Sequence, residues 1–426
     1  MLLILLIFLF ILALAAFLAW PELSLYALAI SLPVIGWNFS WHNFTLPLVD
    51  LVAVLALIAF FLRLSFQLLF KRAKVVKLKW PMFLPFAIFI GVNFISALLG
   101  DTIYSLWYLT RWLLLLYFGY IFLPYNLITS GRVLKKTVMA LVASTLIVLL
   151  SGYLSFYGQD WRDSFFRLKS ISILGIFPFG DNQNLIAEFL NVGAFLILAL
   201  KDWTKNLRAK RLWDVAFILT ALGIIMTFSR AGWITLTLQL VIYAWYRLRN
   251  KVKKTSIIFG TLGLLILLVP LGWKMTQLQQ DNTSSTENRL LLAEISWQAF
   301  LDKPYFGYGS GQFINLVADN IRFTAKYGAP LDSHGILQKV IAETGAFGLA
   351  ALFFIMLYLL QRGYRSLKLY YRDNNWILSL WLAGAGGLFF QFFNTSYYKG
   401  KVWLPLALAL AATRLLEAKY GTSKQE

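Results

Sequence analysis

The sequence predicts an all-α fold, a polytopic bundle of transmembrane helices with one large loop outside the cytoplasm. Apolar residues make up 59% of the 426 residues and only 14% are charged, which is too apolar for a water-soluble protein of this length. Apolar runs of about 17–22 residues recur, which is the length that crosses a bilayer as a helix. The strands of a membrane barrel would be shorter and would alternate in polarity.

The apolar segments predict about 12 membrane spans, with 13 as the upper count. The first segment resembles a signal peptide, but no basic residues precede it and no small-residue cleavage site follows before Trp20. We therefore expect it to be retained as a helix. The segments lie near residues 2–20, 23–36, 46–62, 81–99, 105–123, 137–156, 184–200, 212–228, 231–248, 255–273, 335–360, 376–394 and 402–416.

Six basic connecting segments set the expected orientation. Because basic loops stay in the cytoplasm, the alternating segments 100–104, 157–183, 229–230, 274–334 and 395–401 are expected outside. The alternation is consistent from residue 63 onward. Before it, either the N-terminus lies outside or one of the first two apolar segments does not span, and we favour both ends inside. The basic segments are 63–79, 132–136, 201–211, 247–254, 362–372 and the C-terminal tail.

This topology divides the chain into three parts. Transmembrane helices and their cytoplasmic basic loops occupy residues 1–273, a loop domain outside the cytoplasm occupies 274–334, and C-terminal helices with a cytoplasmic tail occupy 335–426. The net charge of +20 would suggest nucleic acid in a soluble protein. Here the basic residues cluster in loops beside the bilayer, so membrane lipids are the expected partners and nucleic acid is not.

The residue types present disfavour metal and redox sites. The chain has no cysteine and only two histidines, His42 and His334, which excludes disulfides and thiolate metal sites. The carboxylates outside the apolar segments are scattered singly, so they do not form a ligand set. We expect no metal and no cofactor.

The large outer loop is expected to contain an amphipathic helix. A capping-box pattern at residues 284–287 precedes apolar residues at helical spacing, and the helix should end before Pro304. The glycine-rich run 307–311 either lets the backbone approach a ligand or merely reverses the chain. The apolar stripe of the helix, expected on the membrane surface or on the bundle, consists of Leu290, Ala293, Trp297 and Phe300.

Four basic residues near the outer ends of apolar segments are candidates for binding. Charges there need a partner, a water-filled cavity or an anionic substrate. Lys339 stands four residues before Glu343, and the two are expected to neutralise each other on one helix face. The remaining candidates are Arg111, Arg230 and Arg289.

Arg230 lies in a tight outer hairpin with no acidic residue nearby in the sequence. Guanidinium groups hold phosphate oxygens in a bidentate manner, so two of them facing one cavity would suit a diphosphate. The alternative is that Arg230 reaches toward lipid head groups.

His334 is the candidate general base. It follows Asp332 and Ser333, which are expected to cap a helix, and a neutral imidazole can take a proton from a hydroxyl near pH 7. A single histidine can equally be structural. His42, in a short aromatic outer turn, is expected to be an interfacial residue.

These residues resemble motifs of the O-antigen ligase and O-antigen polymerase superfamily of bacterial envelope glycosyltransferases. The motifs occur in one order over roughly residues 170–350. They are Phe228–Gly232, then Glu287–Arg289 with Lys303–Gly309, then His334 with Glu343–Leu349, and the segment Gly175–Leu190 also resembles a family element.

The resemblance implies a membrane-embedded, GT-C-like and metal-independent inverting glycosyltransferase in the bacterial inner membrane, with a periplasmic active site. Arg230 and Arg289 would bind the diphosphate of an undecaprenyl-diphosphate-linked glycan donor, with His334 as the base. Arg111, Ser229 and Asn288 would support them. Gly335 stands where many relatives have a polar residue, which leaves the surroundings of the base less defined.

Three functions remain open at this point. An O-antigen ligase of lipopolysaccharide biosynthesis would transfer the glycan to a lipid A core sugar. A polymerase of O-antigen or exopolysaccharide would transfer it to a growing glycan. A transporter would move a lipid-linked saccharide without chemistry, but its ionisable residues would be expected near the membrane midplane. We favour the ligase.

Overall fold

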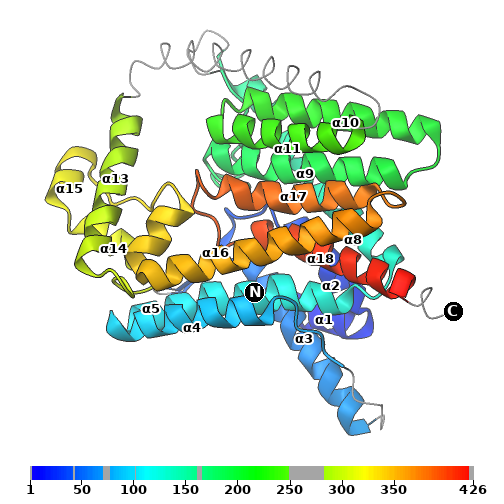
Figure 1. Cartoon of the computed structure of the whole chain (residues 1–426), viewed down its shortest axis with the longest axis horizontal. Coiled ribbons are helices and arrows are strands. Elements are labelled where there is room, and N and C mark those ends of the chain that lie inside the picture. The colour runs from blue at the N-terminus through cyan, green and yellow to red at the C-terminus, as the bar shows by residue number, and fades with distance from the viewer. Residues whose placement is uncertain are drawn as a thin grey trace.

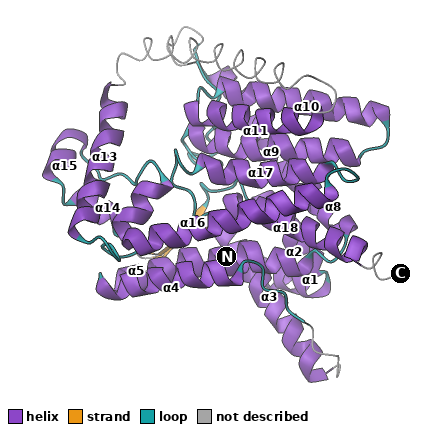
Figure 2. Cartoon of the chain, in the orientation of Figure 1, coloured by secondary structure: helices purple, strands orange, loops and turns teal. Residues whose placement is uncertain are grey.

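The computed structural model describes residues 2–41, 44–70, 77–100, 102–160, 166–248 and 283–421. Helices form nearly all of its regular structure (Figure 2), which confirms the predicted helical fold. The sequence did not predict one element, a hairpin in which β1 (Asn38–Trp41) pairs antiparallel with β2 (Phe44–Pro47). Its alternating aromatic and polar residues suit a short two-stranded sheet.

The helices follow the apolar segments closely. Residues 103–127 form one continuous helix in which α-helical and π-helical turns alternate. In chain order the elements are α1 (Leu2–Ala19), α2 (Pro21–Ser31), α3 (Leu48–Phe70), α4 (Phe83–Leu99), α5 (Thr102–Tyr108), η1 (Leu109–Leu114), α6 (Leu115–Tyr117), η2 (Phe118–Phe122), α7 (Leu123–Leu127), α8 (Gly131–Leu154), η3 (Ser155–Gly158), α9 (Gln183–Trp203), α10 (Leu207–Met226), α11 (Arg230–Leu248), α13 (Thr283–Asp302), α14 (Phe313–Ala318), α15 (Ile321–Tyr327), α16 (Ile336–Tyr370), α17 (Trp376–Phe390) and α18 (Gly400–Gly421).

The described residues contain several helices able to cross a membrane, so the chain is a multi-pass membrane protein. Five are long and apolar enough, namely Leu48–Phe70, Ile103–Leu127, Gly131–Gly158, Gln183–Trp203 and Ile336–Tyr370, and three shorter apolar helices accompany them. The expected total of about 12 spans stays a prediction, because segment 255–273 lies outside the described residues.

Helix α2 bears on the inconsistency at the N-terminus. It has only 11 residues, which corresponds to about 16 Å of helix, whereas the hydrocarbon core is about 30 Å thick. The second apolar segment therefore does not form a full-length span by itself. This favours the option in which one of the first two segments does not cross.

The long helices pack around α9, whose residues 186–200 are all buried. In Figure 1, α9, α10, α11 and α17 run side by side, and α16 runs alongside them. Helices α13, α14 and α15 gather at one end of the bundle, and the C-terminus lies at the other end.

Segments expected on the same side of the membrane contact one another. Among the outer set, the Gly36 N–H donates to the Pro178 carbonyl (3.0 Å), and Ser333 and Thr395 share a hydroxyl–hydroxyl hydrogen bond (2.9 Å). Among the inner set, Arg247 pairs with Asp202. These contacts join segments that the topology expects on the same side, and the topology itself stays a prediction.

Helix α13 begins and ends close to its predicted limits, but its buried face differs from the predicted stripe. Its buried apolar residues are Leu292, Ile295 and Ala299, whereas Leu290 is 66% and Trp297 53% exposed. The helix carries apolar residues on more than one face, so the spacing of apolar residues did not reveal which face packs against the rest of the protein. The buried face packs with residues of α14 and α15 in a cluster separate from the main core.

Candidate active site

The short turn between α10 and α11 positions Arg230. Phe228 adopts a left-handed conformation (φ +53°), which reverses the chain. The Ser229 hydroxyl then accepts a hydrogen bond from the Gly232 N–H (3.2 Å), as an N-cap does. Arg230 is therefore the first residue of α11, with its side chain exposed. Ser229, predicted as a supporting residue, is buried and acts on this backbone.

Arg289 lies on α13, close enough to Arg230 for the two charges to interact. The pKa of Arg289 is lowered by burial of the guanidinium and by the positive charge of Arg230. No ion pair among the described residues involves either arginine. Two like charges held close together without a carboxylate favour the binding of an anion.

Asn288, predicted as a supporting residue, precedes Arg289 on α13. Its side-chain oxygen is buried and has no hydrogen-bond partner among the described residues. Such a group costs free energy unless a partner satisfies it. It can accept a hydrogen bond from a ligand hydroxyl.

His334 completes the cluster at the entrance of α16. Its side chain is half-buried, and its pKa is lowered by burial and by the charge of Arg289, while Asp332 acts in the opposite direction. The neutral imidazole is thus the dominant form at neutral pH, which is the form that accepts a proton. The structure brings Arg230, Arg289 and His334 together from three distant parts of the sequence.

An ion-pair network supports the segment that carries His334. Lys339 donates to both carboxylate oxygens of Asp332 (2.8 Å each) and lies 3.7 Å from Glu343. The predicted pair of Lys339 with Glu343 is confirmed, but the sequence did not identify Asp332 as the closer partner. The prediction considered only residues four positions apart on one helix, such as Lys339 and Glu343, whereas Asp332 precedes the helix and lies seven positions before Lys339.

The predicted helix cap at residues 332–333 is wrong. The residue preceding α16 is Gly335, and no side chain caps the helix. The Ser333 hydroxyl donates to the Gly335 carbonyl (3.1 Å) and bonds with Thr395. The Asp332 carboxylate binds the buried ammonium of Lys339 instead of capping the helix. A buried charge without a partner costs more free energy than a helix N–H without a cap.

The glycine-rich run 307–311 forms a turn that packs against α16 near Glu343. The Gly309 N–H donates to the Glu343 carbonyl (2.9 Å), and the Phe313 N–H donates to the Glu343 side chain (3.2 Å). Gly345 has φ +62° and kinks α16 where the turn reaches it. A Cβ on Gly307 would lie 2.4 Å from the Glu343 backbone. Of the two alternatives, the structure supports the chain reversal.

Residues 215–353 match the family model described as O-antigen ligase. The chain carries an O-antigen ligase domain. The superfamily predicted from the motifs is confirmed, and glycosyltransferase-type chemistry is what this superfamily implies. The matched range includes Arg230, Arg289 and His334. No curated protein matches the chain.

Two residues singled out in the sequence are not placed in this site. Arg111, which precedes the O-antigen ligase domain, lies in η1, and its supporting role stays a prediction. His42 lies outside the described residues. In the described ranges, no three His, Cys, Asp or Glu side chains are grouped so as to hold a metal, and independence from metal stays an expectation.

A second buried ion pair beside the O-antigen ligase domain was not predicted. Glu188 of α9 pairs with Lys401 of α18 (2.6 Å), and both side chains are almost fully buried. Glu188 also accepts hydrogen bonds from Gln391 (2.9 Å) and Asn394 (3.0 Å). The signal was present, because a carboxylate inside an apolar segment marks a functional or paired position.

Proposed function

We propose that the chain is a metal-independent inverting glycosyltransferase. It transfers a glycan from an undecaprenyl-diphosphate carrier to an acceptor hydroxyl at the periplasmic face of the inner membrane. The acceptor is a lipid A core sugar, so the chain acts as an O-antigen ligase. One observation carries the proposal: two arginines without carboxylate partners lie beside a neutral histidine at one end of an apolar helical bundle.

An apolar cavity supports a donor that carries a lipid chain. The cavity has a volume of about 450 Å³ and lies between α11, α16 and α17. One of its lining residues is Phe392, whose backbone approaches the Gly335 position next to His334. A polyprenyl chain in this cavity would place its diphosphate toward the two arginines.

The arrangement suits a single displacement. The acceptor hydroxyl attacks the anomeric carbon from the face opposite the lipid diphosphate, while His334 takes the hydroxyl proton. The bond from the anomeric carbon to the diphosphate oxygen breaks, and its electrons leave with the diphosphate. Arg230 and Arg289 stabilise that negative charge, a type of contact whose loss typically costs about 3–4 kcal/mol of barrier.

The test separates donor binding from transfer. Full-length protein in nanodiscs is given undecaprenyl-diphosphate-linked glycan and lipid A core, and both donor affinity and product are measured. His334→Ala should bind the donor normally and lose about 10²–10⁴-fold in rate. Unchanged turnover would remove His334 from the mechanism, and loss of binding together with turnover would make it a structural residue.

A deletion strain distinguishes ligase from polymerase. Loss of all polymer from lipid A, with accumulation of lipid-linked chains, is the result expected of a ligase. Lipid A that carries a single repeat unit would instead identify a polymerase and contradict the proposed acceptor.

A further inference from the structure

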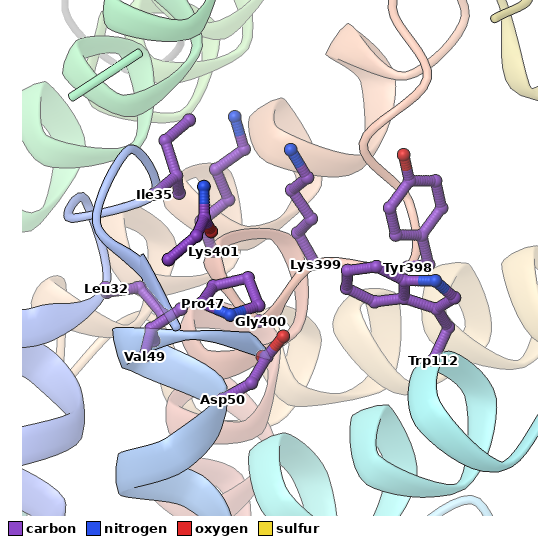
Figure 3. A pocket seen from close by; sticks show the side chains of 11 residues that line it. Leu32, Ile35, Pro47, Val49, Asp50, Trp112, Tyr398, Lys399, Gly400 and Lys401 are labelled. Carbon is purple, nitrogen blue, oxygen red and sulfur yellow. The ribbon is translucent and has the colours of Figure 1, made fainter. Parts of the chain in front are cut away.

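A cavity of about 220 Å³, lined by apolar side chains and two lysines, lies between the α2–β1 connection, the start of α3 and the loop that joins α17 to α18. Figure 3 shows the side chains that line it. A buried water needs only about 10–15 Å³, so this cavity, here called the Lys399 cavity, admits a much larger group. Its walls include Leu32, Asn38, Trp112, Tyr398, Lys399 and Lys401.

Two lysines line the Lys399 cavity. Of the two, only Lys401 forms an ion pair among the described residues, while the Lys399 ammonium lies 5.9 Å from the centre of the Tyr398 ring. Lys399 and Lys401 project in the same direction, away from the carboxylate of Asp50 (Figure 3). Lys401 forms the ion pair with Glu188. No ion pair among the described residues involves Lys399. The pKa of Lys399 is lowered to about 8 by burial and by the charge of Lys401.

The carboxylates that face Lys399 are engaged elsewhere. Glu188, Asp50 and Asp332 oppose the lowering of its pKa, which shows that their charges reach it. Glu188 binds Lys401, Asp332 binds Lys339, and Asp50 accepts a hydrogen bond from the Tyr120 hydroxyl (2.7 Å). An anion that enters the cavity would therefore find its partner in Lys399.

The Lys399 cavity is also lined by aromatic rings and an amide, which can contact the uncharged part of a ligand. The rings of Trp112 and Tyr398 lie 4.7 Å apart and form one wall. Such rings pack against the C–H face of a sugar, while the Asn38 amide can bond hydroxyls. This combination suits an anionic sugar better than a bare ion.

The loop between α17 and α18 connects the Lys399 cavity to the candidate active site. The Tyr398 ring centre lies 5.4 Å from the Lys339 ammonium, which holds Asp332 next to His334. Thr395 of the same loop bonds with Ser333. The cavity is thus linked to the segment that carries His334 through Tyr398 and Lys339. It is not lined by the two arginines assigned to the donor.

We propose that the Lys399 cavity binds a sugar bearing a carboxylate or a phosphate, and that this sugar belongs to the acceptor glycan. Lys399 holds the anionic group, and Trp112 with Tyr398 contacts the ring. Assignment of the sugar to the acceptor rests on the proposed function, whereas binding of the anionic sugar does not.

The test measures how fast an amine-reactive reagent modifies Lys399 at pH 7 in the full-length protein in phosphatidylcholine nanodiscs, read by mass spectrometry. Lys136, exposed on α8, is the internal reference. Glucuronate and glucose 6-phosphate should slow modification of Lys399 several-fold and leave Lys136 unchanged. Glucose should have no effect, and inorganic phosphate should protect less than either charged sugar.

Three outcomes would overturn the proposal. Equal protection by inorganic phosphate would reduce the cavity to an anion site. Protection by phosphatidylglycerol nanodiscs without added sugar would assign it to a lipid head group. Modification of Lys399 that no ligand alters would remove the site.

A second measurement tests the link to the acceptor. Lys399→Gln should raise KM for an acidic acceptor about tenfold, while donor affinity and kcat stay near wild type, and Lys136→Gln should change none of these. If the wild type forms no product, the proposed function fails while the protection result stands. If KM is unchanged in Lys399→Gln although charged sugars protect Lys399, the sugar does not belong to the acceptor.

Discussion

At the scale of single residues, the sequence singled out candidate reactive groups, whose roles stay predictions, but not the ion pairs that surround them. Arg230, Arg289 and His334 were predicted from their types and positions, because an arginine without an acidic neighbour and a rare histidine stand out in an apolar chain. Asp332 and Lys399 were not predicted. Their roles depend on contacts with Lys339 and Lys401 that only the folded chain reveals.

The pKa of His334 should respond in opposite directions to its two charged neighbours. Its folded value lies below 6.5 in part because of Arg289, and Asp332 acts against that lowering. Arg289→Gln should therefore raise the pKa of His334, and Asp332→Asn should lower it. NMR titration of the imidazole measures this directly, since His42 is the only other histidine and His42→Gln assigns the signal. A shift of the same sign in both variants would contradict the assigned contacts.

The two arginines should act through charge and through geometry. Arg230→Ala and Arg289→Ala should each reduce transfer by about 100-fold or more, because each removes stabilisation of the leaving diphosphate. Arg→Lys at either position should recover only part of the rate, since lysine keeps the charge but loses bidentate bonding. Arg322, exposed on α15, is a matched control, and Arg322→Ala should transfer normally. Wild-type turnover in both active-site alanine variants would reduce Arg230 and Arg289 to lipid anchors.

At the scale of elements, some helix limits were predictable and packed faces were not. The end of α13 before Pro304 was predicted, whereas α3 and α16 continue to Phe70 and Tyr370, beyond the apolar runs that ended near residues 62 and 360. The buried face of α13 was misassigned, because Leu290 and Leu292 are equally apolar and only the neighbouring helices decide which is covered. The hairpin β1–β2 was missed for a similar reason, since four-residue strands carry little periodic signal.

The kink of α16 should depend on a glycine at position 345. Gly345 adopts φ +62°, and a Cβ there would lie 2.5 Å from the Tyr305 backbone. Gly345→Ala should lower the thermal unfolding midpoint in detergent, because φ +62° with ψ −157° is a conformation almost restricted to glycine, which costs another residue about 1–3 kcal/mol. Gly91→Ala is the control, since a Cβ at this position in α4 meets no atom within 4 Å. An equal midpoint in both variants would show that the kink tolerates a side chain.

At the scale of the whole molecule, the bundle buries a pair of opposite charges between helices. The pair of Glu188 with Lys401 joins α9 to α18 across 213 residues, half of the chain length. Such a pair contributes little net stability but penalises arrangements that separate its members. Hydropathy predicted that the described chain is helical, and the total number of spans stays a prediction. The pairing of Glu188 with Lys401 required the three-dimensional structure.

The orientation of the bundle is the prediction on which the site assignment depends. Basic segments such as 201–211 and 362–372 should face the cytoplasm, which places Arg230, Arg289 and His334 in the periplasm. A reporter fused after Thr283 should therefore score as periplasmic, and one fused after Lys251 as cytoplasmic. A further fusion after Asn206, in the turn between α9 and α10, should also score as cytoplasmic, because Asn206 lies within a basic segment. If all three fusions gave the opposite result, the arginines would face the cytoplasm, where a glycan donor presented on the periplasmic side could not reach them.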